Sequence, residues 1–271
     1  MTALQSTHSP EIRRAKILEY LDQIGGCRIE HLVERFNVSG MTIRRDLHDL
    51  AAAGKVIRTH GGATAATRVS FDFQFLRRTL EHAAEKEEIA RVAASMVQPG
   101  DTVMLDSGTT TLAISNRLKA IEGLCVITTS LPIASALFGC ENIEVIILGG
   151  VLRKESPDLM GMITDHNLDM LNADIAFVGV DAVDLEGNIY YASAVVGRTI
   201  SHLIQAANKS YAVADHTKIN KRDLIRFGHL SEWDGLITDT GLDVSKKQSL
   251  ENARAVVFQL QESGGQPVDA T

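Results

Sequence analysis

The sequence predicts a mixed α/β protein, with a small helical unit at the N-terminus and a larger unit built on a mostly parallel sheet. Three observations support this class. Short capped helices and a glycine-rich strand pair occupy the first 65 residues. After residue 84, apolar runs of strand length alternate with segments of helix length, which is the pattern of a parallel sheet covered by helices on both faces. With 271 residues, of which 45% are hydrophobic, the chain is long enough for two folded units.

The composition argues against a secreted chain, a membrane span and a metal site. Charged residues interrupt the first 20 positions, so we expect no signal peptide and a cytoplasmic location. The longest uncharged stretch, 123–140, has hydroxyl-bearing residues through its middle and is not expected to cross a membrane. Cys27, Cys125 and Cys140 lack the spacing of a disulfide or zinc site and are expected to be buried free thiols.

The charge is unevenly divided between the two parts of the chain. Residues 1–68 carry ten basic and seven acidic residues, a balance of +3, whereas the remainder carries 17 basic and 27 acidic residues, a balance of −10. Only the N-terminal part is therefore suited to a polyanion such as nucleic acid.

Three short helices are predicted in the N-terminal unit. The first begins at Ser9 and Pro10, because a hydroxyl cap followed by a proline at the first helical position is a typical helix start. Apolar residues at positions 17, 21 and 24 continue it, and the glycines at 25 and 26 end it. A second helix is predicted over 29–36, a tight turn follows at Asn37 and Val38, and Ser39 caps the third helix.

The third helix has two different faces. At 100° per residue, Ile43, Leu47 and Leu50 share one face, and the opposite face carries Met41, Arg44, Arg45 and His48. This is the geometry of a helix-turn-helix, whose second helix lies in the major groove, where arginine can make a bidentate contact to guanine. Ser39 and Thr42 near the helix start are suited to phosphate oxygens. The simpler alternative is a three-helix module with solvated arginines.

A basic strand pair follows the third helix. The stretch KVIRTHGGA predicts a strand that enters a turn at Gly61 and Gly62, as in the wing of a winged helix. Lys55, Arg58 and His60 are expected to lie beside the DNA backbone. The continuous stretch VSGMTIRRDLHDLAAAGKVIRTHGGA, and above all its TIRRDL core and R-x-H-G-G-A end, resembles the DNA-binding signature of the DeoR family of bacterial transcriptional regulators. This resemblance implies a winged helix-turn-helix that binds double-stranded operator DNA.

Seven strands are predicted in the larger unit. The runs are TVMLD, LCVITT, IEVIILGG, IAFVGVD, SYAVAD, WDGLITD and AVVFQL, and helix-length segments separate them. In a parallel sheet of this kind, ligands bind at the carboxyl ends of the strands. The residues found there are Asp106, Ser107, Gly108, Thr109, Thr110, Thr128, Thr129, Ser130, Gly149, Gly150, Asp181, Asp215, His216 and Lys218. The Ser107 to Thr110 loop precedes a helix and is suited to a phosphate. Asp181 and Asp215 are suited to sugar hydroxyls, and Lys218 to an anionic group.

This second half also resembles the DeoR family, whose effector domain is similar in fold to ribose-5-phosphate isomerase and senses phosphorylated sugars or related metabolites. The motifs EKEEIA, DSGTTT, ILGG, FVGVD, D-x-x-K and LITD carry the resemblance. It implies an effector site formed by the strand-end residues above, with Arg153 as a further candidate. Thr129 stands where the family often has asparagine. The segment after Gly187 lacks the usual acidic residue and carries Tyr190, Tyr191 and Arg198, which makes Arg198 another candidate.

The predicted domains are a winged helix-turn-helix over 1–65, a linker over 66–83, an effector-binding and oligomerisation α/β domain over 84–262, and a flexible tail over 263–271. The favoured hypothesis is a repressor of a carbohydrate or polyol operon whose repression is relieved by a phosphorylated sugar-type effector. We expect it to form dimers or tetramers, to have no enzymatic activity and to need no cofactor or metal. A sugar-phosphate isomerase with a helical extension is one alternative, since Asp181 and Asp184 stand three positions apart as a carboxylate pair. The other is a regulator whose second domain serves only in assembly.

Overall fold

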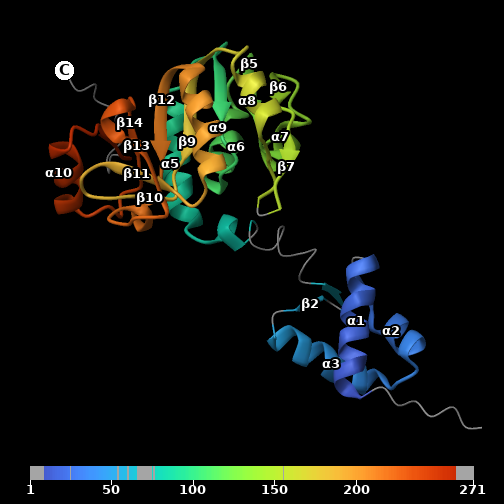
Figure 1. The fold of residues 1–271 in the computed structure, drawn as a ribbon. Coiled ribbons are helices and arrows are strands. Elements are labelled where there is room, and N and C mark those ends of the chain that lie inside the picture. The colour runs from blue at the N-terminus through green and yellow to red at the C-terminus, as the bar shows by residue number, and fades with distance from the viewer. Residues whose placement is uncertain are drawn as a thin grey trace, which may run out of the picture. The chain divides into compact units, whose positions relative to one another are not determined.

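The computed structural model describes residues 9–24, 26–53, 55–59, 61–65, 75, 77–154 and 156–260 (Figure 1). The chain divides into two compact units, residues 1–76 and 77–271. Most of the predicted linker, together with Gly25, Gly54, His60 and the predicted tail, lies outside the described residues.

The N-terminal unit consists of three helices and a small antiparallel sheet. Its helices are α1 (Pro10–Ile24), α2 (Ile29–Phe36) and α3 (Gly40–Ala52), and its strands are β1 (Gly26–Arg28), β2 (Val56–Thr59) and β3 (Gly62–Ala65) in the order β1-β3-β2. Ser9 and Ser39 cap α1 and α3 as the sequence predicts, since their Oγ atoms accept from Ile12 N at 3.3 Å and Thr42 N at 3.2 Å. Asn37 adopts the left-handed conformation that ends α2, with φ 51°.

Strand β1 is an addition that the sequence does not predict. It pairs with β3 so closely that a Cβ on Gly62 would lie 2.2 Å from the Cys27 carbonyl oxygen. The core beneath the helices and sheet is formed by Ile17, Leu21, Leu32, Ile43, Leu47, Leu50, Val56 and Ala63.

The second unit is built on a seven-stranded parallel sheet in the order β15-β14-β12-β9-β4-β5-β6, which confirms the predicted fold class. The strands are β4 (Thr102–Leu105), β5 (Leu124–Thr128), β6 (Ile143–Ile147), β9 (Ala173–Gly179), β12 (Ala207–Val213), β14 (Gly235–Ile237) and β15 (Val257–Phe258). All seven coincide with the apolar runs of the sequence.

Helices cover both faces of this sheet. Helices α5 (Ala83–Ser95), α6 (Thr109–Leu118) and α7 (Leu131–Leu137) pack on the face that carries Val103, Leu105 and Phe177. Helices α8 (Met162–Leu168), α9 (Ala194–Gln205) and α10 (Val244–Asn252) pack on the face that carries Met104, Ala176 and other alternate residues. The alternation of strand side chains between two helical layers explains why the buried parts of the strands are apolar on both faces.

Several short elements were not predicted from the sequence. They are the hairpin β7 (Val151–Leu152) and β8 (Leu159–Met160), the small sheet β10 (Ala182–Val183), β11 (Asn188–Tyr191) and β13 (Ile225–His229), and the 3-10 turns η1 (His216–Lys218) and η2 (Leu230–Glu232). The three cysteines are free thiols, but they are half-buried rather than buried as expected.

Candidate functional site

Helix α3 presents the basic face that the sequence predicts. Ile43, Leu47 and Leu50 are buried in the core of the unit, whereas 78% of Met41 is exposed on the other side. Arg44, Arg45 and His48 are also exposed. Neither guanidinium forms a hydrogen bond or an ion pair with another described residue, so both are available to an external anion.

The acidic residues of α3 point away from this face. Asp46 is buried, and its carboxylate accepts from Arg13 Nε at 2.5 Å and from Arg14 Nε at 3.2 Å. Asp49 forms an ion pair with Arg14 at 2.8 Å. Because α1 neutralises both carboxylates, the exposed face of α3 is left with a positive charge.

The strand pair after α3 carries the remaining predicted DNA contacts. Lys55 and Arg58 are exposed, next to and within β2. The turn into β3 contains Gly61, whose φ of 87° favours glycine. His60 lies outside the described residues, so its predicted contact is not placed.

In the second unit, the candidate site lies where the strand order changes direction. From β4 the chain adds β5 and β6 on one side, then returns to place β9 and β12 on the other side of β4. Such a switch point leaves a crevice at the carboxyl ends of the two central strands. Asp106 stands directly after β4, and its Oδ2 accepts from Gly179 N at the end of β9 at 2.9 Å.

The loop from Asp106 to Thr110 opens α6 as predicted. Gly108 N donates to Asp106 Oδ1 at 3.2 Å and to Thr111 Oγ1 at 2.9 Å. The backbone N–H groups of Thr109 and Thr110 have no acceptor among the described residues. They lie at the positive end of the α6 dipole, which is suited to a phosphate.

Burial raises the pKa of Asp106 to about 7, although hydrogen bonds from Thr111, Gly108 and Gly179 oppose this shift. Asp158 also raises this pKa. A buried carboxyl group whose pKa is raised in this way is typical of a functional site.

Arg153 is brought to this loop through Asp158. Its Nε and Nη2 donate to the two carboxylate oxygens of Asp158, both at 2.7 Å, and Ser107 Oγ donates to the same carboxylate. Asp158 is fully buried, so the guanidinium and the loop hydroxyl are held by one acceptor.

Thr128, Thr129 and Ser130 are buried and serve mainly in structure. Thr128 Oγ1 accepts from Ser130 N at 3.1 Å, and Ser130 Oγ caps α7 by accepting from Ile133 N at 3.3 Å. The Thr129 carbonyl accepts from Leu159 N at 3.0 Å. Their direct contact with an effector stays a prediction.

The glycine pair after β6 has a packing reason. A Cβ on Gly150 would lie 2.1 Å from Thr164 Oγ1, and the same hydroxyl donates to the Gly149 carbonyl at 2.7 Å. Close approach of β6 to α8 therefore requires glycine at position 150. A contact between this turn and an effector stays a prediction.

Asp181 and Arg198 differ in their surroundings. Asp181 is exposed after β9 and accepts from Ala192 N at 3.0 Å. Tyr191, whose hydroxyl donates to the Gly179 carbonyl at 3.1 Å, has its pKa raised by burial and by Asp106 and Asp181. Arg198 is occupied by an ion pair with Asp165 on α8 at 3.0 Å.

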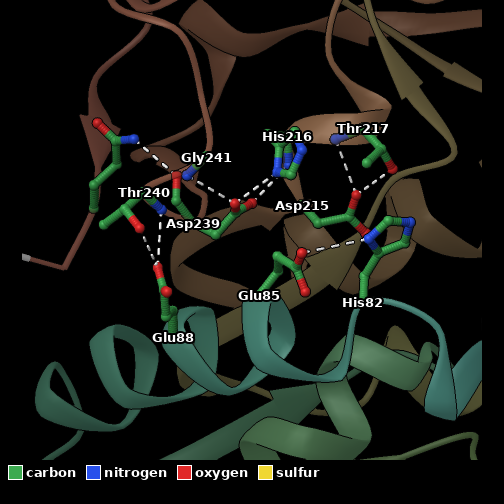
Figure 2. Close-up of polar contacts among 10 residues, drawn as sticks. His82, Glu85, Glu88, Asp215, His216, Thr217, Asp239, Thr240 and Gly241 are labelled. Carbon is green, nitrogen blue, oxygen red and sulfur yellow. Dashed lines mark hydrogen bonds and ion pairs between the residues drawn. The ribbon is translucent and has the colours of Figure 1, made fainter.

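The turn after β12 extends the site along the same edge (Figure 2). Asp215 is buried and caps η1 by accepting from Thr217 N at 3.0 Å. His216 is held by Asp239, which follows β14: its N–H donates to Oδ1 at 2.6 Å and its Nδ1 donates to Oδ2 at 2.7 Å. Since neighbouring strands are about 4.8 Å apart, the ends of β4, β9 and β12 span roughly 10 Å.

Lys86 is a residue that the sequence reasoning missed. It lies in the first turns of α5 and is 6% exposed, although it carries a charge. Burial lowers its pKa, while Asp215 raises it and Lys218 lowers it, so both groups of the β12 turn act on this ammonium. The one signal in the sequence is its helical phase, which it shares with the buried Ile89 and Ala93.

Both units match models of known protein families. Residues 13–69 match the model described as the DeoR-like helix-turn-helix domain. Residues 81–240 match the DeoR C terminal sensor domain, which is more than half of the chain. The chain belongs to the DeoR family of transcriptional regulators. The DeoR signatures predicted from the sequence are thereby confirmed.

Named relatives of this DeoR-family chain are similar over nearly their whole length. The glycerol-3-phosphate regulon repressor of Escherichia coli K12 is 32% identical, with 88% of this chain and 94% of that protein covered. The HTH-type transcriptional repressor GlcR of Bacillus subtilis 168 is 35% identical, with coverage of 84% and 88%. Among solved structures, ribose 5-phosphate isomerase A of Methanocaldococcus jannaschii is 18% identical, with a TM-score of 0.38 over 51% of this chain and 55% of that one. No helix in the described part of the chain has the length and apolar character of a membrane span.

Proposed function

We propose that this DeoR-family regulator represses a carbohydrate or polyol operon and that a phosphorylated sugar-type metabolite relieves the repression. The observation that carries the proposal is the polar edge of the second unit, where Asp106 and the N-terminus of α6 follow β4 and the polar turn follows β12, with the end of β9 between them. Two positions on this edge suit a phosphate, the N–H groups of Thr109 and Thr110 and the ammonium of Lys218, and the carboxylates of Asp181 and Asp215 suit the sugar hydroxyls.

In the proposed complex with DNA, α3 lies in the major groove. Arg44, Arg45, His48 and Met41 face the base edges, and Ser39, Thr42, Lys55, Arg58 and His60 face phosphates. The two relatives, one named as a glycerol-3-phosphate regulon repressor and the other as a transcriptional repressor, support this assignment. One helix reads few base pairs, so we also propose that the chain acts as a dimer or tetramer on paired half-sites, which light scattering at working concentration would test.

The isomerase alternative has less support. Asp184, the second carboxylate of the pair considered from the sequence, accepts from Asn188 N and Glu186 N at 3.0 Å each, from Tyr190 Oη at 2.9 Å and from Arg222 Nε at 3.0 Å. A carboxylate whose oxygens are engaged in this way anchors a turn and is poorly placed to transfer a proton.

The test is a fluorescence anisotropy titration of the full chain on DNA from upstream of its own gene and of neighbouring operons. A panel of sugar and polyol phosphates is then added to the complex. Specific binding that one phosphate weakens supports the proposal. If the chain binds or isomerises a sugar phosphate but does not bind DNA, the proposal is contradicted. If it binds DNA specifically and no phosphate changes the affinity, the second unit serves only in assembly.

A further inference from the structure

Lys86 makes two contacts with the segment at the start of the second unit. Its Nζ donates to the carbonyl oxygens of Arg78 and Glu81. Both acceptors belong to the segment that precedes α5 in the chain, so the ammonium ties this segment to the body of the unit.

The two carbonyl groups need an external donor. Residues 77–80 are helical, and the Glu81 N–H extends the helix by donating to the Arg77 carbonyl at 2.9 Å. His82 then adopts a left-handed conformation with φ 52°, which ends this helix before α5 begins at Ala83. The last carbonyls of a helix lack backbone N–H partners, and a cation at that end also complements the helix dipole.

The position of Lys86 explains how it reaches them. Side chains of an α-helix lean toward its N-terminus, so a lysine in the first turns of α5 projects back toward the residues before the helix. The side chain is buried there. The same α5 segment is fixed to the loop after β14, because Glu88 Oε2 accepts from Thr240 N and Oγ1, both at 2.9 Å (Figure 2).

The charged residues of the β12 turn also influence the Lys86 ammonium electrostatically. The residues beside Lys86 meet this turn, because the rings of His82 and His216 lie edge to face with centroids 6.3 Å apart (Figure 2). The charges of Asp215 and Lys218 have opposite effects on the pKa of Lys86. A phosphate that binds at Lys218 therefore adds negative charge beside an ammonium that is bonded to neutral carbonyl oxygens. Hydrogen bonds between an ammonium and a phosphate are stronger than those to a neutral acceptor.

We propose that Lys86 is a latch that couples occupancy of the effector site to residues 77–82, the segment that leads to the DNA-binding unit. This inference rests on the proposed function and adds its route of regulation. Without effector, the ammonium holds the carbonyl end of the 77–81 helix. A bound phosphate attracts the ammonium, the carbonyls of Arg78 and Glu81 lose their donor, the segment loosens and operator affinity falls.

The latch is tested first without any ligand, by hydrogen-exchange mass spectrometry of the full chain. Lys86→Met keeps the length of the side chain and suits a buried position, but it removes the donor. We expect amides in 78–86 to exchange about tenfold faster or more, with β12 unchanged. Lys119→Met is the control, because Lys119 contacts Asn116 on the surface of α6 at 2.8 Å. Exchange in Lys86→Met equal to the wild type would overturn the latch.

The ligand step is tested with glycerol 3-phosphate and inorganic phosphate as probes. For the wild type we expect a thermal shift and weaker operator binding. Lys86→Met should keep the thermal shift and lose at least nine-tenths of the change in operator affinity, whereas Lys218→Met should lose the thermal shift and keep the exchange protection of 78–86. Lys86→Gln retains an uncharged donor, so it should preserve part of that protection but not the response.

The outcomes separate the latch from the proposed function. A Lys86→Met variant that responds like the wild type, or one that no longer binds the probe, overturns the latch, because the first shows no coupling and the second makes Lys86 an ordinary ligand residue. If the wild type binds operator but neither the probes nor the wider phosphate panel changes that binding, both the proposed effector class and the ligand-driven step are contradicted. The exchange result on the unliganded variant stands independently of that outcome.

Discussion

Replacing Arg45 by alanine should separate DNA recognition from folding. The guanidinium is exposed and bonded to no described residue, so its loss should change the free energy of unfolding by no more than about 0.5 kcal/mol. A bidentate contact to guanine contributes about 1–3 kcal/mol of discrimination, which corresponds to about a 5- to 150-fold loss of affinity at each half-site. Arg44→Ala should behave in the same way. A two-fold complex on two half-sites would double the loss in free energy.

The assay is fluorescence anisotropy on the specific fragment and on a scrambled fragment of equal length, over a range of salt concentrations. Arg45→Ala should lower the ratio of specific to non-specific affinity. Arg58→Ala is the matched control, because a phosphate contact should weaken binding to both fragments and reduce the salt slope by about one. If Arg45→Ala lowers the affinity for both fragments equally, or lowers the melting temperature as much as a core variant such as Leu47→Ala, then Arg45 does not contact bases.

Three further predictions concern stability. Leu47 is 1% exposed, so Leu47→Ala should destabilise the N-terminal unit by about 2–5 kcal/mol in urea unfolding, and a loss no larger than that of Arg45→Ala would contradict the two-faced helix. The pKa of Asp106 is raised from 3.8 to about 7 in the folded chain, so its contribution to stability is complete below pH 3.8 and is lost as pH rises through the folded pKa. The loss reaches about 4 kcal/mol. Asp106→Asn should therefore flatten the dependence of melting temperature on pH between 4 and 8. Parallel pH curves for the variant and the wild type would refute this. Gly150→Ala would place Cβ 2.1 Å from Thr164 Oγ1 and should lower the free energy of unfolding by about 1–3 kcal/mol. Gly139→Ala is the control, because no described atom beyond its chain neighbours lies within 4 Å of its added Cβ, and it should be neutral. Equal melting temperatures for the two variants would show that the turn at Gly150 can relax.

The main sheet could be predicted from the sequence because most of its strands are largely buried on both faces. Each appears as a continuous apolar run that ends in polar or glycine residues, and the run alone fixes its place in the chain. Strand β1 has three residues without a pattern, and β7 and β8 have two each. These elements form because a larger neighbour offers them backbone partners, so their own residues carry little signal.

The candidate site was predicted as a set of strand ends, but the pairings within it were not. Asp239 and His216 are 23 positions apart in the chain, and only the adjacency of β12 and β14 brings the carboxylate to the imidazole. Asp158 joins Arg153 to Ser107 across an unpredicted hairpin. Lys86 was missed because a lysine in an amphipathic helix is normally assigned to solvent.

These pairings suggest that different parts of the edge have different roles. A ligand can shift the equilibrium between two conformations only by the difference in its affinity for them. The loop from Asp106 to Thr110 is fixed by Gly179 and Asp158, so it can bind a phosphate equally in both conformations and contribute affinity without coupling. Lys86, in contrast, donates to the carbonyls of Arg78 and Glu81, and in the proposed latch it exchanges them for a phosphate at the β12 turn. An effector that engages Lys86 therefore binds the unlatched conformation more tightly, and by reciprocity operator DNA must weaken effector binding by the same factor.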